Sequence, residues 1–224
     1  MAILFAQAAT CRLDAVKGRL RMFKSKRIGI YSGTFDPVHT GHITFALQSL
    51  ASSNLDEVYF LPERRPRNKA QVEHFAHRVA MLKQAIKPHP QFKVLELVDI
   101  SFSIERTLPK LQTLFAGDQL VFLVGSDVVP KIMNWPNVSR LLKSSELVVG
   151  FRSGGSLDTI KQSIKDLPIS PKNVTYINSY APSVSSAKVK EGLRSQRRVA
   201  GILKSVERYS NRNWLYISLA IDKP

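Results

Sequence analysis

The stretch "RIGIYSGTFDPVHTGHITFALQSLASSNLDEVYFLP", residues 27–62, decides the fold class. Residues 27–33 form a short β-rich run that ends in glycine, which predicts a strand followed by a tight turn. Residues 42–53 carry apolar side chains at 43, 46, 47 and 50, which is helical spacing. Residues 55–62 predict a second strand that Pro62 ends. This order of strand, helix and strand is typical of a parallel βαβ unit.

The same alternation continues to the end of the chain. Further strands are expected at residues 92–97, 119–127, 146–152 and 173–179. Further helices are expected at 74–86, 103–115, 138–145, 185–196 and 200–211, with Pro109 inside the second of them. The continuous apolar run at 119–127 is typical of a strand buried on both faces of a parallel sheet. The sequence therefore predicts a doubly wound α/β domain with a small helical C-terminal part.

Composition narrows the class of protein. The 224 residues, 44% of them hydrophobic, suit one domain with a real core. No apolar stretch approaches the roughly 18–20 residues that span a bilayer. The single cysteine, Cys11, excludes an internal disulfide and a multi-cysteine metal site, which favours a reduced, cytoplasmic protein. The net charge of +16 attracts anions, without choosing between nucleotides, nucleic acid and an acidic membrane surface.

Residues 1–26 form an appendage before the domain. Its apolar start precedes its basic residues, the reverse of the order in a secretory signal. An amphipathic helix, a transit-like segment and translation from Met22 all remain open. We expect the domain at 27–216 and a short tail at 217–224.

Three segments follow predicted strands, at residues 33–42, 125–127 and 152–155. In open α/β sheets, ligands bind beyond the carboxyl ends of the strands, so these segments are expected to share one site. Gly33 allows the backbone to approach a ligand, and the helix that begins near Gly41 presents N–H groups that attract an anion. His39 and His42 can each donate to a phosphate oxygen and stabilise charge at a reacting phosphorus. The alternative is that both histidines only cap the helix.

The segment "GTFDPVHTGH" (33–42) resembles the signature of the nucleotidylyltransferase superfamily, with its H-x-G-H element. A longer match, over 27–216, is to bacterial nicotinate-nucleotide adenylyltransferases. The pieces that carry it stand in family order: "LDEVYFLP" (55–62), "HRVAML" (77–82), "FLVGSD" (122–127), "NW" (134–135), "LVVGFRSG" (147–154), "VSSAKVK" (184–190) and "NWLY" (213–216).

This resemblance implies a reaction and a set of residues. The phosphate of a pyridine mononucleotide attacks the α-phosphorus of ATP, pyrophosphate leaves and a dinucleotide forms. His39 and His42 are the implied catalytic residues on the ATP phosphates, where Mg²⁺ bridges the phosphates without a dedicated protein metal site. The expected ATP-binding residues are Gly33, Thr34, Phe35, Gly41, Lys69, Gly125, Asp127, Arg152, Ser185, Ser186 and Lys190, and the expected acceptor-binding residues are Ser103 and Trp135.

For several of these residues, a purely structural role is the alternative to the functional one. Asp127 matches the acid that holds the adenosine ribose, or else caps its loop. Trp135 matches an aromatic that stacks on the pyridine ring, or else packs in the core. Lys69 matches a basic residue near the phosphates, or else is a solvated charge. Ser185 and Ser186 lie where a hydroxyl and a helix N-terminus can both reach phosphate.

The sequence departs from the family pattern at several positions. Lys190 replaces an arginine, which keeps the charge and loses the bidentate fork. Ala187 replaces a threonine, and Asn68 stands where histidine is usual. The pyridine-recognition segment G-P-S-Y-T reads "DISFS" (99–103), followed by an apparent one-residue insertion. These changes fall mainly on the acceptor half of the site.

Two further readings concern metal and phosphate. His74 and His77 stand three apart on a helix, which indicates a packed helix more than a metal pair. The glycines at 153–155 mark a loop, and Arg152 before them is the better phosphate ligand.

The favoured function is transfer of AMP from ATP to nicotinate mononucleotide in NAD biosynthesis. Another phosphorylated acceptor is one alternative, and a non-catalytic nucleotide- or nucleic-acid-binding protein on the same fold is the other. The sequence predicts no membrane partner and leaves nucleic acid and a homo-oligomer open.

Overall fold

The computed structural model describes residues 24–67, 69, 71–152, 156–179, 184–195, 197 and 200–217, with only the backbone of Arg152 and Ser179. The strands are β1 (Arg27–Gly33), β2 (Glu57–Pro62), β3 (Phe92–Val94), β4 (Gln119–Gly125), β5 (Glu146–Arg152) and β6 (Val174–Ser179). The helices are α1 (Thr40–Ser52), α2 (Phe75–Ile86), α3 (Thr107–Leu114), α4 (Val129–Ile132), α5 (Val138–Ser144), α6 (Leu157–Lys165), α7 (Ser186–Arg194) and α8 (Lys204–Arg212).

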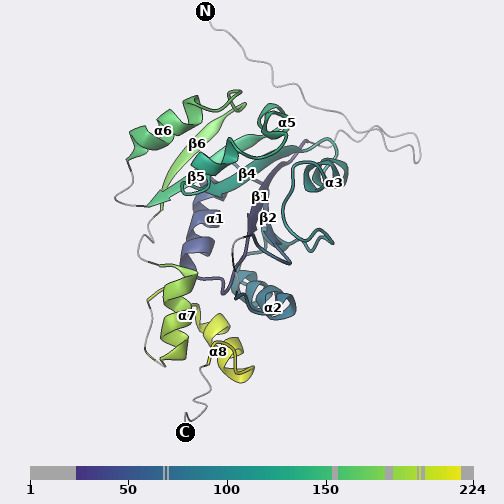
Figure 1. Cartoon of the computed structure of the whole chain (residues 1–224). Helices are drawn as coiled ribbons and strands as arrows, with labels where there is room; N and C mark the ends of the chain where they lie inside the picture. The colour runs from purple at the N-terminus through teal and green to yellow at the C-terminus, as the bar shows by residue number, and fades with distance from the viewer. Residues whose placement is uncertain are drawn as a thin grey trace, which may run out of the picture.

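The described strands form one six-stranded sheet in the order β3-β2-β1-β4-β5-β6 (Figure 1). Every neighbouring pair in it is parallel. The chain winds outward from β1 to β3 and then returns to place β4 against the other side of β1. The direction of winding therefore reverses between β1 and β4, where such sheets open a crevice at the carboxyl ends of the strands. The predicted doubly wound fold is confirmed.

Both faces of the sheet are covered by helices, and β4 shows why. Leu120 and Phe122 point to one face, while Val121 and Leu123 point to the other, because successive side chains alternate along a strand. All four are 5% exposed or less. A strand buried on both sides needs a continuous apolar run, as the sequence predicted for this segment.

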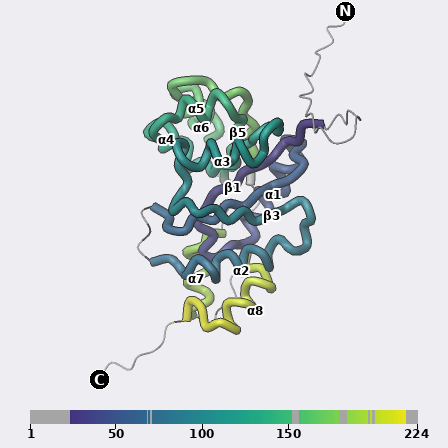
Figure 2. The backbone as a smooth tube through the Cα atoms, turned by 90° about the vertical axis from the view of Figure 1, so that its right-hand side faces the viewer, coloured from purple at the N-terminus to yellow at the C-terminus, as the bar shows by residue number. Residues whose placement is uncertain are grey.

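The two faces carry separate apolar clusters. Helices α1, α2 and α8 pack on one face, around residues that include Phe45, Met81 and Val206. Helices α3, α4, α5 and α6 pack on the other, around residues that include Leu108 and Leu141. Figure 2 shows α7 and α8 together at one end of the molecule, beside α2. The C-terminal helices are therefore an integral layer next to the carboxyl-end crevice.

Some elements differ in length from the prediction. Strand β3 stops at Val94 instead of residue 97, although the Leu95 N–H still donates to the Phe60 carbonyl at 2.9 Å. Helix α3 begins at Thr107 instead of residue 103, so Pro109 falls in its first turn, where a missing N–H costs no helical hydrogen bond. The short helix α4 and the longer helix α6 were not predicted.

The ends of the chain are only partly described. Residues 1–23 of the expected appendage and 218–224 of the expected tail lie outside the described residues. Within the described part, Lys26 extends the pairing of β1 with β4 by one residue, since its carbonyl accepts from the Gln119 N–H at 2.8 Å. None of the helices in this part is both long and apolar enough to cross a membrane.

Candidate active site

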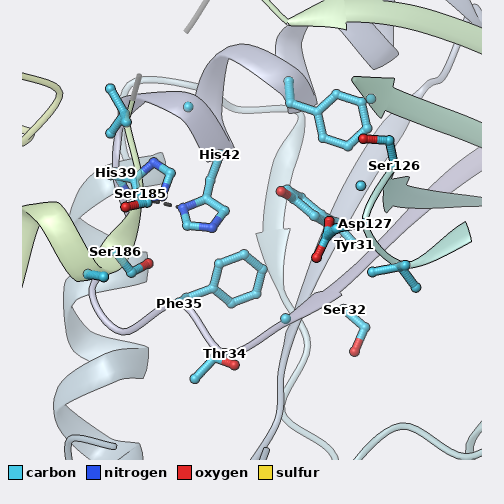
Figure 3. Close-up of a pocket in the computed structure, with 18 of the residues that line it drawn as sticks. Tyr31, Ser32, Thr34, Phe35, His39, His42, Ser126, Asp127, Ser185 and Ser186 are labelled. Atoms are coloured by element: carbon cyan, nitrogen blue, oxygen red, sulfur yellow. Dashed lines mark hydrogen bonds between the residues drawn. The ribbon is translucent and has the colours of Figure 1, made fainter. Parts of the chain in front are cut away.

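A cavity of about 460 Å³ opens at the carboxyl ends of β1, β4 and β5 (Figure 3). We call it the polar cavity. Its walls are the loop after β1, the first turn of α1, the turn after β4 and the first turn of α7. The residues that line it are Tyr31, Ser32, Gly33, Thr34, Phe35, His39, Gly41, His42, Phe45, Lys69, Gly125, Ser126, Asp127, Val128, Gly150, Phe151, Val184, Ser185, Ser186 and Ala187.

His39 and His42 form the first turn of α1. His39 is the extended N-cap residue, and its backbone N–H donates to Nδ1 of His42 at 3.2 Å. The centroids of the two rings lie 3.7 Å apart. Figure 3 shows both residues on one wall of the cavity. Because Nδ1 of His42 accepts a hydrogen bond, the proton of the neutral ring is on Nε2. Capping and a functional role are therefore compatible, since they use different nitrogens of His42.

Phe35 supports this turn from below. Its backbone is left-handed, with φ at 49°, and its side chain is only 1% exposed. The ring packs edge-on against His42, with centroids 5.1 Å apart, and against Tyr31 at 5.4 Å. A Cβ on Gly33 would stand 3.0 Å from the Phe35 ring, which explains the glycine there. Phe35 thus reaches the cavity wall mainly as packing for His42.

Asp36 is the buried centre of the loop, 3% exposed. Its carboxylate accepts from Lys190 Nζ at 2.9 Å and from Tyr216 Oη at 2.7 Å. The Glu73 backbone N–H adds a longer bond of 3.3 Å. Burial, together with the Asp36 charge, raises the pKa of Tyr216 far above its ordinary value, so its hydroxyl stays a donor. The loop before His39 is therefore tied to α7 and to the last turn of the described chain.

Lys190 lies elsewhere than expected. Its ammonium is paired with Asp36, and the residues that line the polar cavity do not include it. The physical reason is the buried carboxylate, which needs a charged partner once it is removed from water. Sequence reasoning placed Lys190 on the ATP phosphates because nothing local to α7 indicates Asp36.

Arg78 of α2 is fully buried behind the loops. Its guanidinium donates to four carbonyls, those of Thr34, Glu63, Arg64 and Glu73, at 2.7–3.0 Å. Burial lowers its pKa below the ordinary value, although nearby carboxylates oppose that change. Because its acceptors follow β1 and β2, Arg78 fixes the two loops to each other. Sequence reasoning gave this arginine no role, since its helix predicts only an amphipathic segment.

Asp127 stands on the wall made by the turn after β4. A Cβ on Gly125 would lie 2.6 Å from Asp127 Oδ1, so a side chain at position 125 would displace the carboxylate from this position. The Ser126 N–H donates to the Gly150 carbonyl at 2.8 Å and fixes the turn to β5. The carboxylate lies across the cavity from the α7 serines (Figure 3).

The N-terminus of α7 forms the opposite wall. Ser185 is the N-cap residue, and its hydroxyl accepts from the Lys188 N–H at 3.3 Å. Ser186 Oγ donates to the Pro37 carbonyl at 3.0 Å, which joins α7 to the loop before His39. At the mouth of the cavity, Lys69 Nζ donates to Thr34 Oγ1 at 2.9 Å. Two helix N-termini and one ammonium group therefore surround the polar cavity, and each favours an anion.

A second cavity, of about 330 Å³, adjoins the first. We call it the aromatic cavity, because Phe102, Phe122 and Trp135 line it. It shares the end of β1 and the start of the turn after β4 with the polar cavity, namely residues 31–34, Gly125 and Val128. The half-buried Trp135 packs on the core and lies 5.9 Å from the Phe102 ring. Trp135 therefore packs on the core and also lines the aromatic cavity, where its stacking on a pyridine ring stays a prediction.

Ser103 lies one cavity further on. Together with Trp135 it lines a smaller cavity of about 190 Å³, and it is absent from the lining of the aromatic cavity. Its backbone forms the turn before α3, because its N–H donates to Thr107 Oγ1 at 3.1 Å and its carbonyl accepts from the Thr107 N–H at 2.7 Å. Phe102, the residue before Ser103, lines both of these cavities.

Comparison with known proteins places this site in a family. The family model described as "Cytidylyltransferase-like" matches residues 30–192. A nicotinate-nucleotide adenylyltransferase of Bacillus subtilis is 31% identical over 86% of this chain and 100% of its own length. A probable nicotinate-nucleotide adenylyltransferase of Coprothermobacter proteolyticus is 31% identical over 88% of this chain and 98% of its own. The chain belongs to the nicotinate-nucleotide adenylyltransferase family.

Solved structures agree with this fold. The nicotinic acid mononucleotide adenylyltransferase of Plasmodium falciparum, complexed with NaAD, superposes with a TM-score of 0.70 at 20% identity. The match covers 85% of this chain and 97% of that one. A putative nicotinate-nucleotide adenylyltransferase from Vibrio parahaemolyticus gives 0.61 at 14% identity, over 85% and 95% of the chains.

The expected site residues of this adenylyltransferase largely converge. The polar cavity brings together Gly33, Thr34, Phe35, His39, Gly41, His42, Lys69, Gly125, Asp127, Ser185 and Ser186. Arg152 ends β5, and its side chain lies outside the described part, as do Asn68 and residues 153–155. His77 contacts Tyr209 Oη at 3.0 Å, as a packed helix requires. The described residues contain no group of three or more side chains that could hold a metal ion.

Proposed function

We propose that this enzyme transfers AMP from ATP to nicotinate mononucleotide, releases pyrophosphate and forms a dinucleotide. One observation carries the proposal: a polar and an aromatic cavity meet along the ends of β1 and β4. Two nucleotides that occupy these cavities would bring their phosphates together over residues 32–34. The activity named for the relatives supports the same reaction.

ATP occupies the polar cavity in this proposal. His42 donates from Nε2 to a phosphate oxygen, because its Nδ1 is engaged by the His39 backbone. The N-termini of α1 and α7 add backbone donors for the triphosphate. Asp127 accepts from the ribose hydroxyls, for which a carboxylate has two oxygens. These donors are held in place before the substrate arrives, which is what stabilises charge as it develops in a transition state.

The acceptor occupies the aromatic cavity. Its pyridine ring packs on Trp135 or Phe102, and its phosphate points toward the shared wall. An oxygen of that phosphate forms a bond to the α-phosphorus of ATP, while the bond to the bridging oxygen breaks and pyrophosphate leaves. A phosphate monoester is already anionic at neutral pH, so the protein needs no general base and supplies alignment instead.

Magnesium enters with ATP in this account. The polar cavity offers one carboxylate, Asp127, among hydroxyl, imidazole and backbone donors. Such a wall fits Mg²⁺ that keeps its waters and binds through the phosphates, and it does not fit a protein cage of carboxylates. When bound, Mg²⁺ would neutralise charge on the leaving pyrophosphate, and His42 and the N-terminus of α7 would hold the phosphates that carry the ion. With two water-soluble nucleotide substrates, we place the reaction in the cytoplasm.

The product identifies the reaction. Purified protein is incubated with Mg-ATP and nicotinate mononucleotide. The products are then separated, identified by mass spectrometry and quantified. The proposal predicts nicotinate adenine dinucleotide and pyrophosphate in equal amounts. ATP binding without any dinucleotide would favour the non-catalytic nucleotide-binding alternative. A dinucleotide formed only with another phosphorylated acceptor would replace the substrate and keep the chemistry.

A further inference from the structure

Three charged side chains line the mainly apolar aromatic cavity, namely Glu63, Arg67 and Lys131. Two are cations and one is an anion, so the described charges on the wall favour an acidic ligand. The polar cavity already provides the site for the triphosphate. In the proposed complex, these charges therefore lie near the ring substituent of the acceptor and not near its phosphate. This substituent is a carboxylate in the nicotinate nucleotide and a neutral amide in the nicotinamide nucleotide.

Glu63 and Arg67 hold Phe102 from its two backbone ends. Glu63 Oε1 accepts from the Phe102 N–H at 3.0 Å. Arg67 Nη2 donates to the Phe102 carbonyl at 3.3 Å. The Phe102 ring faces Trp135, and Arg67 lines both cavities that flank this aromatic pair. Arg67 is therefore placed at the edge of the surface on which the acceptor ring packs.

The remaining donors of Arg67 suit a carboxylate. A guanidinium has five N–H donors, and the bond to Phe102 uses one of them. The others form a planar fork that can bind both oxygens of a carboxylate at once. An amide offers one acceptor oxygen and no charge. Glu63, the only described acid on this wall, already accepts from the Phe102 N–H. Lys131 contributes a point charge from α4, without a fork.

We infer that Arg67 is the residue by which this enzyme selects an acidic pyridine mononucleotide over its amide, through a forked bond to the ring carboxylate. This inference rests on the proposed function. The inference assigns discrimination between acceptors to the segment "PRNK" (66–69), which the sequence analysis connected only with ATP.

The test compares acceptors in five proteins, the wild type and four variants, of which Lys131→Gln tests the other cation on the wall. Arg67→Gln removes the charge and the fork, and Arg67→Lys keeps the charge alone. Arg65→Gln is the matched control, because Arg65 is an exposed arginine of the same loop that does not line either cavity. The specificity constant kcat/KM is measured with nicotinate mononucleotide and with nicotinamide mononucleotide, at saturating Mg-ATP. Thermal unfolding midpoints verify that the variants are folded.

Arg67→Gln is expected to lower kcat/KM for the acid about 10- to 100-fold, mainly through KM, as loss of a charge-assisted bond does. The constant for the amide should stay within about threefold, because the amide does not use the fork. Arg67→Lys should fall between Arg67→Gln and the wild type, and Arg65→Gln should match the wild type.

Other results overturn the inference. Unchanged selectivity in Arg67→Gln excludes the forked bond. An equal loss for both acceptors would mean that Arg67 only supports Phe102. If Lys131→Gln loses its selectivity and Arg67→Gln keeps it, Lys131 is the residue that discriminates between the two acceptors. A wild-type protein that uses neither acceptor refutes the proposed function itself, and this inference with it, whereas an active enzyme with unaltered selectivity refutes only the role of Arg67.

Discussion

Tyr216→Phe removes one hydroxyl from the group of side chains that holds Asp36. That hydroxyl donates to Asp36 Oδ1 at 2.7 Å, and both residues are buried. After the substitution, Oδ1 keeps only the 3.3 Å bond from the Glu73 N–H, and Oδ2 keeps its ion pair with Lys190. The backbone at position 216, with φ at 62°, is equally strained with tyrosine and phenylalanine, so strain cancels in the comparison.

The magnitude follows from the kind of bond lost. A hydrogen bond to a charged group contributes about 1.5–3 kcal/mol, so we expect unfolding to become easier by about 2 kcal/mol. For a domain of this size, that loss lowers Tm by about 4–8 °C. Because Asp36 precedes His39 by three residues, kcat should fall as well, through a less well fixed catalytic turn.

The assay is urea unfolding of the purified protein, followed by fluorescence and by circular dichroism. Tyr209→Phe is the matched control, since its hydroxyl contacts an imidazole nitrogen of His77 at 3.0 Å instead of a carboxylate, and should cost only about 1 kcal/mol. A Tyr216→Phe loss below about 0.5 kcal/mol, or no larger than that of the control, would refute the argument that Tyr216 stabilises a buried carboxylate.

Three further predictions concern catalysis, the acceptor and pH. His42→Ala should lower kcat by about 10²-fold or more in pyrophosphate release assays, because it removes a positioned donor, and near-normal turnover would exclude it from the mechanism. Trp135→Ala should raise the KM of the acceptor more than that of ATP, while equal changes would leave it a core residue only. Arg27→Met should lower the free energy of unfolding by about 1 kcal/mol at neutral pH. The two terminal nitrogens of the guanidinium, Nη1 and Nη2, each donate to the Glu146 carboxylate at 3.0 Å. The Arg27 hydrogen bond holds the pKa of Glu146 below its ordinary value of 4.5. The contribution of the Glu146 pair is thus present above pH 4.5 and lost as the pH falls through the lower folded-state pKa. The gap between the two proteins should therefore narrow in acid to what the Arg27 Nε bond to the Ser53 carbonyl leaves, and a gap that does not change with pH would contradict this.

Local patterns in the sequence were sufficient for the fold and for most of the polar cavity. The apolar runs of β1, β4 and β5 report burial directly, because a central parallel strand cannot tolerate polar side chains on either face. The carboxyl ends of parallel strands meet at one edge, so Gly33 and Asp127 could be placed together without knowing their distance.

The supporting contacts could not be predicted in this way. Asp36 meets Lys190 and Tyr216 across 154 and 180 residues of sequence. Arg78 bonds to carbonyls, which every residue carries, so no side-chain pattern indicates its partners. Ser103 lies in the turn before α3 and outside the lining of the aromatic cavity, because α3 starts four residues later than its apolar spacing indicates.

The central claim is that this site joins two nucleotides by direct attack on ATP. The most direct measurement is the initial rate of pyrophosphate release from Mg-ATP with nicotinate mononucleotide, with nicotinamide mononucleotide and with neither, using the His39→Ala/His42→Ala protein as the blank. The account predicts release that depends on the nicotinate nucleotide in the wild type and falls to background in the double variant. Release that is independent of an acceptor, or that persists in the double variant, would contradict it.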